Sequence, residues 1–203
     1  MAELDDRLDG EPARSGALTY SYRASVLGSN WEFRLLSNVL EWSAGYNRGS
    51  ASYADIARVR LSFRPMTMQS RRYVTEIWIP KRPKLTIAST SLRGVFQQEP
   101  HDADYRAFVS ELVRRIGTAR GRAAMETGSA ALLYWPGVTI FAGVSIALIV
   151  LMLRSLGSAD WSGLAILAAF FAFFLWQVGT FFYRNRPDTF RPDAPPERVL
   201  PPP

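Results

Sequence analysis

Stretches that alternate between polar and apolar residues follow one another through the first half of this chain of 203 residues. The clearest is RVRLSFRP at 58–65, in which Arg58, Arg60 and Arg64 fall on one parity and the apolar residues on the other. Alternation of this kind indicates a strand with one buried and one exposed face. YNRGS at 46–50 is interpreted as a turn, and further alternating runs predict strands at 18–25, 30–36, 38–45, 56–64, 70–79 and 84–90. We therefore expect about five to seven antiparallel strands with short connections.

The period changes in HDADYRAFVSELVRRIG at 101–117. Its apolar residues recur at i, i+3, i+4, i+7, i+8 and i+11, as Tyr105, Phe108, Val109, Leu112, Val113 and Ile116. This spacing is typical of one face of an amphipathic helix, and such a helix needs an apolar surface to cover. The sequence therefore predicts an α+β domain over 17–122, in which an antiparallel sheet or open β-barrel is capped by one C-terminal helix.

Two long apolar runs follow this domain, at 131–153 and 162–183, and neither contains a charged residue. A helix rises about 1.5 Å per residue, so each run is long enough for a hydrocarbon core of about 30 Å. The runs predict a transmembrane hairpin, with 123–130 as a linker before it and 154–161 as a short external loop. Recurring small residues within the runs favour close packing of the two helices, and a homo-oligomer is an alternative use of the same residues.

Arginines are concentrated on one side of the predicted hairpin. Only Arg154 lies in the connecting loop, whereas eight flank the outer ends of the two runs: Arg114, Arg115, Arg120, Arg122, Arg184, Arg186, Arg191 and Arg198. Because cytoplasmic flanks carry excess Lys and Arg, this asymmetry predicts that both termini are cytoplasmic. The acidic segment 1–16 lacks the pattern of a signal peptide and is expected to be disordered. The Pro-rich tail 184–203 is expected to be extended and to dock on its own protein or on nothing.

One segment resembles a known family. SYADIARVRL at 52–61 is similar to the Tyr-x-Asp-Ile-x-x-Val element of bacterial pleckstrin-homology-like (PH-like) domains, with Tyr53, Asp55, Ile56 and Val59 at the matching positions. The helix at 101–117 resembles the closing helix of that domain, with Phe108 in the usual place. The resemblance covers about half of the chain. It implies a PH-like β-barrel with Ile56 and Val59 inward, a binding or scaffolding role without catalytic residues, and a location in the bacterial inner (cytoplasmic) membrane.

Composition removes several classes of chemistry. The chain has no cysteine and a single histidine, His101, so thiolate nucleophiles, disulfides, Cys-ligated zinc and multi-His metal sites are excluded. Phosphate-binding loops, dinucleotide fingerprints, zinc-protease helices and nucleophile elbows are also missing from the sequence. We therefore predict a protein that is not an enzyme and has no cofactor or metal.

Basic residues are concentrated between 58 and 93, where nine Lys or Arg face one acid, Glu76, a local excess of eight positive charges. The candidate residues for binding an anionic surface or partner are Arg58, Arg60, Arg64, Arg71, Arg72, Lys81, Arg82 and Lys84. Three interpretations stay open: a solvated sheet face, a surface for anionic lipid head groups, and a site for an acidic protein. Nucleic acid is not expected, because the sequence lacks a recognition helix and interleaved aromatic residues.

These features give two hypotheses for function. In the first, the protein is a membrane-bound binding or scaffold module that presents its basic face to lipid or to a protein partner. In the second, it is a small accessory or assembly subunit of a larger membrane complex. In that case the Phe-rich second span, with Phe170, Phe171, Phe173, Phe174, Phe181 and Phe182, would pack on partner helices.

Overall fold

The alternating segments form strands in the computed structural model, which describes residues 17–25, 28–65, 71–92, 98–158 and 161–202. The segment 1–16, predicted to be disordered, lies outside the described residues. The first antiparallel sheet has the order β1-β2-β3-β4 and consists of β1 (Leu18–Arg23), β2 (Asn30–Leu35), β3 (Val39–Ala44) and β4 (Asn47–Ser52). Its inward side chains on β1 to β3 include Tyr20, Phe33 and Leu40, all nearly inaccessible to solvent.

Strand β4 occupies residues that the sequence pattern indicated as a turn. The turn is shorter than the predicted turn at 46–50 and begins one residue earlier, at Gly45. The φ of Gly45 is +57°, a conformation that suits glycine. Strand β4 lacks an alternating apolar signal because Gly49 stands where an inward side chain would point. A Cβ atom on Gly49 would lie 2.5 Å from the Trp42 indole, so the neighbouring tryptophan fills that space instead.

The second sheet has the order β11-β10-β5-β6-β7. Its antiparallel centre is β5 (Arg58–Phe63), β6 (Tyr73–Trp78) and β7 (Leu85–Ala88), and the short helix η1 (Tyr53–Asp55) connects β4 to β5. Strands β8 (Thr90–Leu92) and β9 (Gln98–Pro100) form a small separate hairpin. The inward residues predicted for β5, Val59, Leu61 and Phe63, are all buried.

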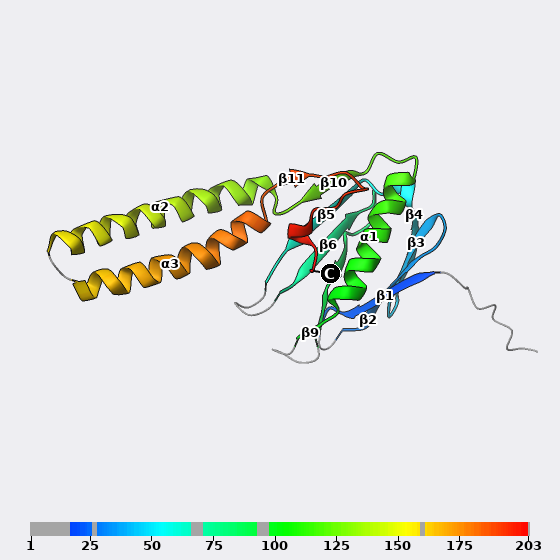
Figure 1. Ribbon diagram of the computed structural model, residues 1–203. Helices are drawn as coiled ribbons and strands as arrows, with labels where there is room; N and C mark the ends of the chain where they lie inside the picture. Colours follow the sequence, from blue (N-terminus) through cyan, green and yellow to red (C-terminus); the bar gives the residue numbers. More distant parts are fainter. Residues whose placement is uncertain (1–16, 26–27, 66–70, 93–97, 159–160, 203) are drawn as a thin grey trace, which may run out of the picture.

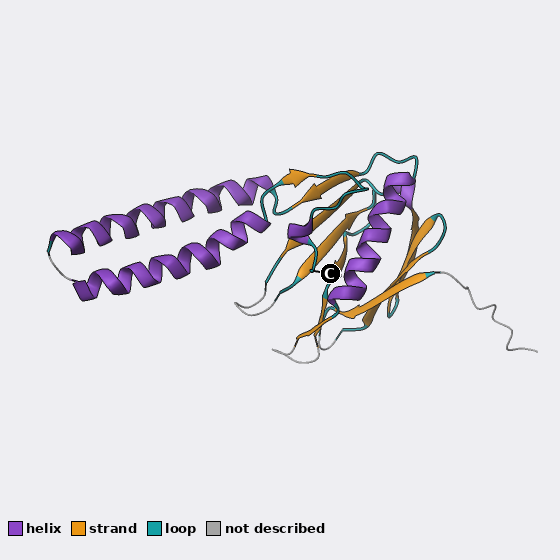
Figure 2. Cartoon of the chain, viewed as in Figure 1, coloured by secondary structure: helices purple, strands orange, loops and turns teal. Residues whose placement is uncertain are grey.

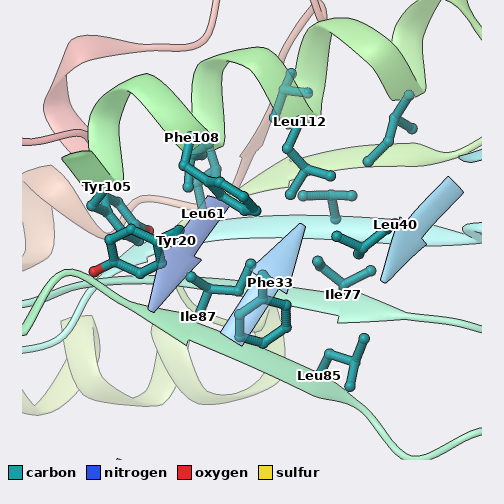
Figure 3. Close-up of a cluster of buried hydrophobic side chains, with 14 of the residues drawn as sticks. Tyr20, Phe33, Leu40, Leu61, Ile77, Leu85, Ile87, Tyr105, Phe108 and Leu112 are labelled. Carbon is teal, nitrogen blue, oxygen red and sulfur yellow. The ribbon is translucent and has the colours of Figure 1, made fainter. Parts of the chain in front are cut away.

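Helix α1 (Asp102–Thr118) lies across strands of both sheets and closes the core (Figure 2). All six residues predicted for its apolar face are buried. Phe108 packs against Tyr20 and Phe33 of the first sheet, at ring-centroid distances of 5.6 and 6.5 Å. Figure 3 shows that these aromatic residues meet Leu61, Ile77 and Ile87 of the second sheet in one cluster. The prediction of an antiparallel α+β domain capped by a helix is therefore confirmed at this level.

The predicted linker 123–130 is not a simple linker in the structure. It contains strand β10 (Ala124–Thr127), which pairs in parallel with β5 and brings Met125 and Thr127 into buried positions. The sequence did not indicate this strand because its partner lies more than sixty residues earlier in the chain. A parallel partner needs a long crossover, which α1 provides here.

The Pro-rich tail also differs from the extended segment that was predicted. It adds β11 (Asp188–Thr189) to the edge of β10 and ends in the short helix η2 (Glu197–Val199). Val199 and Leu200 are 0% and 2% exposed and belong to the hydrophobic core. The tail therefore docks on its own domain, and the core is complete only when residues before and after the two long helices come together.

Arg106 of α1 fixes the end of the tail, and we call its contacts the tail clasp. Its Nη1 and Nη2 atoms donate hydrogen bonds to the Glu197 carboxylate at 2.6 and 2.5 Å, and Nη1 also donates to the Pro201 carbonyl. The hydrogen bonds from Arg106 hold the pKa of Glu197 below its ordinary value. The clasp therefore stabilises the docked tail only while Glu197 is ionised.

A pH-dependent contribution of the tail clasp follows. Because the pKa of Glu197 is lower in the folded protein than in the unfolded chain, its contribution is complete above the ordinary value of 4.5 and is lost as the pH falls through the lowered value. The difference in unfolding free energy between the protein and Glu197→Gln should thus be largest near neutral pH and shrink as the pH falls below 4.5. Urea unfolding at several pH values measures it, and a difference that does not change with pH would contradict the role of the ionised clasp.

Two long helices, α2 (Ala131–Gly157) and α3 (Trp161–Arg184), project together from one end of the domain (Figure 1). Both are long and apolar enough to cross a membrane, and the most apolar stretch of each is 0% buried. They fit an integral membrane protein. They pack on each other as predicted, through Phe141 against Phe174 and Phe182, and through Gly137, which leaves room for Phe182. Gly143 faces away from these contacts.

Candidate binding surface

The arginines of β5 share one face of the second sheet, as the alternation predicted. Arg58, Arg60 and Arg64 lie on the side opposite the buried Val59, Leu61 and Phe63. Ser62, between them, is fully buried, so the face is not a continuous solvated stripe. What these arginines contact is decided by the neighbouring strands on either side.

Glu126 of β10 neutralises part of this face. Because β10 pairs in parallel with β5, Glu126 lies directly beside Arg60. Its Oε2 accepts a hydrogen bond from Arg60 Nη2 at 2.6 Å, and its Oε1 lies 3.4 Å from Arg58 Nε. Sequence reasoning missed this acid, since it stands outside the basic segment and reaches it only through the parallel pairing.

Glu76 of β6 neutralises a second pair of cations. Its side chain is only 3% exposed, and its two carboxylate oxygens accept hydrogen bonds from Arg64, at 2.8 Å, and from Lys84. Four of the eight candidate residues, Arg58, Arg60, Arg64 and Lys84, are thus held in ion pairs. A large part of the local positive excess is used within the sheet.

Removal of the Glu76 carboxylate should destabilise the domain. Glu76→Ala leaves Arg64 and Lys84 without the acceptor that they share, and we expect a loss of about 2 kcal/mol of unfolding free energy. Glu32→Ala is the matched control, because the Glu32–Arg34 pair is exposed by 35% and 49% and should contribute less than about 1 kcal/mol. Urea unfolding compares the two variants, and equal losses would contradict a structural role of Glu76.

Trp78 organises the same face, although the sequence pattern did not single it out. The guanidinium carbons of Arg58 and Arg60 lie 5.5 and 5.3 Å from the centre of its ring, and Lys84 Nζ lies 5.6 Å away. Such cation–π contacts fix long side chains that would otherwise move freely in solvent. Trp78 stands opposite Arg58 in the register of β5 and β6. Its position beside the arginines follows from this strand pairing.

The candidate residues divide between the two ends of the second sheet. We call the end at Phe63 and Tyr73 helix-proximal, because Asn185, directly after α3, is hydrogen bonded to Phe63 there. The end at Arg58, Trp78 and the β6–β7 turn is helix-distal. Phe63 is the fifth residue after Arg58, which corresponds to about 17 Å along a strand. The predicted basic face therefore extends between two ends, and Glu76 joins Arg64 to Lys84 between them.

Arg64, Arg71 and Arg72 belong to the helix-proximal end, and we call them the helix-proximal arginines. Arg64 and Arg72 face each other across β5 and β6, where Arg64 N donates to Arg72 O at 2.8 Å. Arg71 precedes Arg72 and is exposed. At the end of α3, Arg184 donates from Nη1 to the Tyr73 hydroxyl at 3.1 Å and lies over the Phe63 ring. Arg184 and the helix-proximal arginines thus lie next to Phe63 and Tyr73, where the second sheet contacts the end of α3.

Asn185 joins this end of the domain to α3. It is fully buried, its Oδ1 accepts from Phe63 N at 3.1 Å, and its Nδ2 donates to Phe63 O at 2.7 Å. Its backbone carbonyl accepts from Ser129 N at 3.0 Å, so the start of α2 is fixed to the end of α3. The geometry holds the helical hairpin in one position relative to the arginines.

Lys81, Arg82 and Lys84 belong to the helix-distal end. Lys81 and Arg82 are exposed in the turn Pro80–Lys81–Arg82–Pro83, and Arg82 lies 5.4 Å from the centre of the Trp42 ring. No carboxylate of the described residues forms an ion pair with Lys81 or Arg82. Beside this turn, a groove of about 530 Å³ lies between β4 and the end of β6.

Within the described part of the chain, no group of three or more His, Asp or Glu side chains is placed to hold a metal ion. The second sheet thus presents basic residues at both of its ends, with a groove beside the helix-distal end. No family model, curated protein or solved structure matches this chain.

Proposed function

We infer that the protein is a non-enzymatic membrane module that holds a PH-like domain at the cytoplasmic surface of a bacterial inner membrane. The observation that carries this proposal is the position of the helix-proximal arginines, which are close in sequence to Phe63 and Tyr73, the residues that contact the end of α3. Both α2 and α3 are long and apolar enough to cross a membrane. In this role the helices anchor the protein, and the arginines contact anionic lipid head groups.

Several features support the PH-like part of the proposal. Strands β1 to β9 are antiparallel to their neighbours among them and are followed by a helix that covers the core, as the resemblance implies. Tyr53, Ile56 and Val59 of the matching element are buried, and the Tyr53 hydroxyl donates to Leu36 O at 2.8 Å. Phe108 of the closing helix is buried in the same core.

Electrostatics favour lipid at the helix-proximal end rather than at the other end. A basic residue near an anionic membrane surface contributes about 1 kcal/mol, and this attraction decays within a Debye length of about 8 Å at physiological ionic strength. Residues at the base of the hairpin lie within that range. Lys81 and Arg82 lie at the other end of the sheet, about 17 Å away along β5, and we expect them to gain less from this attraction.

Lipid binding by the domain alone tests this proposal. Because Ser129 N and Asn185 O are 3.0 Å apart, a short Gly-Ser linker replacing residues 130–184 should leave the domain intact, and we call this protein the hairpin-replaced form. Arg64→Gln with Arg71→Gln should weaken its binding to anionic vesicles by about 30-fold, as about 1 kcal/mol per charge predicts. Co-sedimentation at physiological salt measures the change.

A matched control tests whether vesicle binding depends on where the two charges lie in the domain or only on the net charge of the protein. Lys81→Gln with Arg82→Gln removes the same two charges at the helix-distal end and should change vesicle binding by less than about threefold. Equal weakening in both variants, or no preference for anionic over neutral vesicles, would reject lipid contact by the helix-proximal arginines.

A second candidate function is an accessory subunit of a larger membrane complex. Phe170 and Phe173 on α3 are 54% and 45% exposed in the single chain. They offer a surface for helices of another protein. Purification in mild detergent distinguishes the two functions, since a subunit co-migrates in fixed proportion with other membrane proteins and a lipid-contacting module does not.

A further inference from the structure

The groove at the helix-distal end, which we call the distal groove, has an apolar floor and a basic rim. Its floor is formed by Ala51 of β4, Ile56 after η1, and Ile79 after β6. These three side chains belong to the buried core and are at most 8% exposed. The rim includes Ser50, Pro80, Arg82 and Arg122, so three separate segments of the chain meet at the groove.

One wall of the distal groove is an outer strand. Strand β4 ends the first sheet, and no other strand of the described residues pairs with its outer edge. The outer edge of a sheet presents backbone N–H and C=O groups that an added strand can bind. An extended segment placed along β4 would therefore find backbone partners on one side and the apolar floor below.

Most of the charged residues at the distal groove are basic. Arg82 and Arg122 line it, Lys81 is adjacent, and Asp55 is the only carboxylate among its lining residues. Arg122 is exposed, and no ion pair joins it to another described residue. The guanidinium of Arg82 lies over the Trp42 ring, which holds it beside Gly49 of β4. This arrangement presents two guanidinium groups, each able to donate a pair of hydrogen bonds to a carboxylate that enters the groove.

Lys81 is held in an unfavourable backbone conformation at the same place. Its φ is +61°, and Arg82 N donates to Ile79 O at 3.2 Å, so Lys81 occupies the position of a turn that normally requires glycine. A non-glycine residue in this conformation costs on the order of 1 kcal/mol, and such strain is concentrated at functional sites. A lysine at this position places a third cation beside the groove.

We propose that the distal groove binds an extended acidic segment of a partner protein, added as a strand along β4. The segment places carboxylates against Arg82 and Arg122 and alternate side chains over Ala51 and Ile79. This proposal rests on the proposed role as a binding module, but not on lipid contact, because it uses the opposite end of the domain. We expect its partner to come from the aqueous phase, because the groove and the hairpin base lie at opposite ends of the second sheet.

Binding of a short fluorescent polyglutamate peptide to the full chain in neutral-lipid nanodiscs tests the proposal. Fluorescence anisotropy at physiological salt should detect binding, and Arg82→Gln with Arg122→Gln should weaken it by about tenfold or more. Both side chains are on the surface, so an unchanged unfolding midpoint confirms that the variant is folded. Hydrogen exchange of the Asn47–Ser52 amides should slow when the peptide is bound, which a purely diffuse attraction would not produce.

Arg64→Gln with Arg71→Gln is the matched control, and it should leave peptide binding unchanged within about twofold. Absence of binding, equal weakening in the control, or unchanged exchange in β4 would each overturn the proposal.

Equally tight binding of an oligothymidylate with the same dependence on Arg82 and Arg122 would assign the groove to nucleic acid instead. A tenfold gain in affinity after removal of residues 2–16, which carry five acids and two arginines, would assign it to the chain's own N-terminus. Failure of this test with intact vesicle binding would leave the proposed lipid contact standing.

Discussion

Removal of residues 187–203 is expected to unfold the domain or to reduce its unfolding free energy by about 5 kcal/mol. The truncation deletes two buried core residues, Val199 and Leu200, and loss of a buried leucine alone costs about 2–5 kcal/mol. It also leaves Arg106 without the partners of the tail clasp. Since small domains are stable by only about 5–15 kcal/mol, the effect is a large part of the total.

Urea unfolding of the hairpin-replaced form with and without residues 187–203 measures this loss. Truncation after Pro201 is the control, because it retains both core residues and the carbonyl that Arg106 contacts. The same reasoning predicts that a fragment ending at 122 is unfolded, as it lacks Met125 in addition to the tail. A stable fragment 1–122, or a truncated form with an unchanged midpoint, would contradict a core completed by the tail.

Substitution of Asn185 by leucine should reduce the unfolding free energy by about 4 kcal/mol. Both backbone groups of Phe63 are hydrogen bonded to this one side chain in a fully buried position. An unsatisfied buried polar group costs about 1–3 kcal/mol, and Asn185→Leu creates two of them. The measurement is urea unfolding of the full chain in detergent, monitored by tryptophan fluorescence.

Arg186→Ala is the control for Asn185, because the neighbouring arginine is exposed and its loss should change stability by less than about 0.5 kcal/mol. Asn185→Asp adds a second comparison, since it retains an acceptor for Phe63 N and loses the donor to Phe63 O. It should fall between the native protein and Asn185→Leu. Similar stability of all variants would show that the junction is not held by these hydrogen bonds.

Local periodicity was sufficient to predict much of the domain. Alternation on β5 identified both its inward residues and the shared face of its arginines, because side chains on a strand alternate strictly. The helical period at 101–117 identified all six buried residues of α1. The two long apolar runs correspond to α2 and α3, and only their ends differ by a few residues.

The parts that were not predicted depend on contacts between distant segments. Strand β10 contains a single fully apolar inward residue, Met125, and exists because it pairs with β5. Val199 and Leu200 stand in a proline-rich tail, where composition favours an extended solvated chain over a core contact. Glu126 lies outside the basic segment, so counting charges along the sequence overestimated the free positive charge on β5.

The most direct test of the central claim is the position of the domain relative to the membrane. The chain has no cysteine, so single spin labels can be attached at Pro65→Cys, next to Arg64, and at Ser50→Cys, at the distal groove. In nanodiscs with anionic lipid and a nickel-chelating lipid, the label at 65 should be strongly relaxed by nickel and the label at 50 should not. Equal relaxation of the two labels, or stronger relaxation at 50, would contradict the claim that the helix-proximal arginines face the membrane.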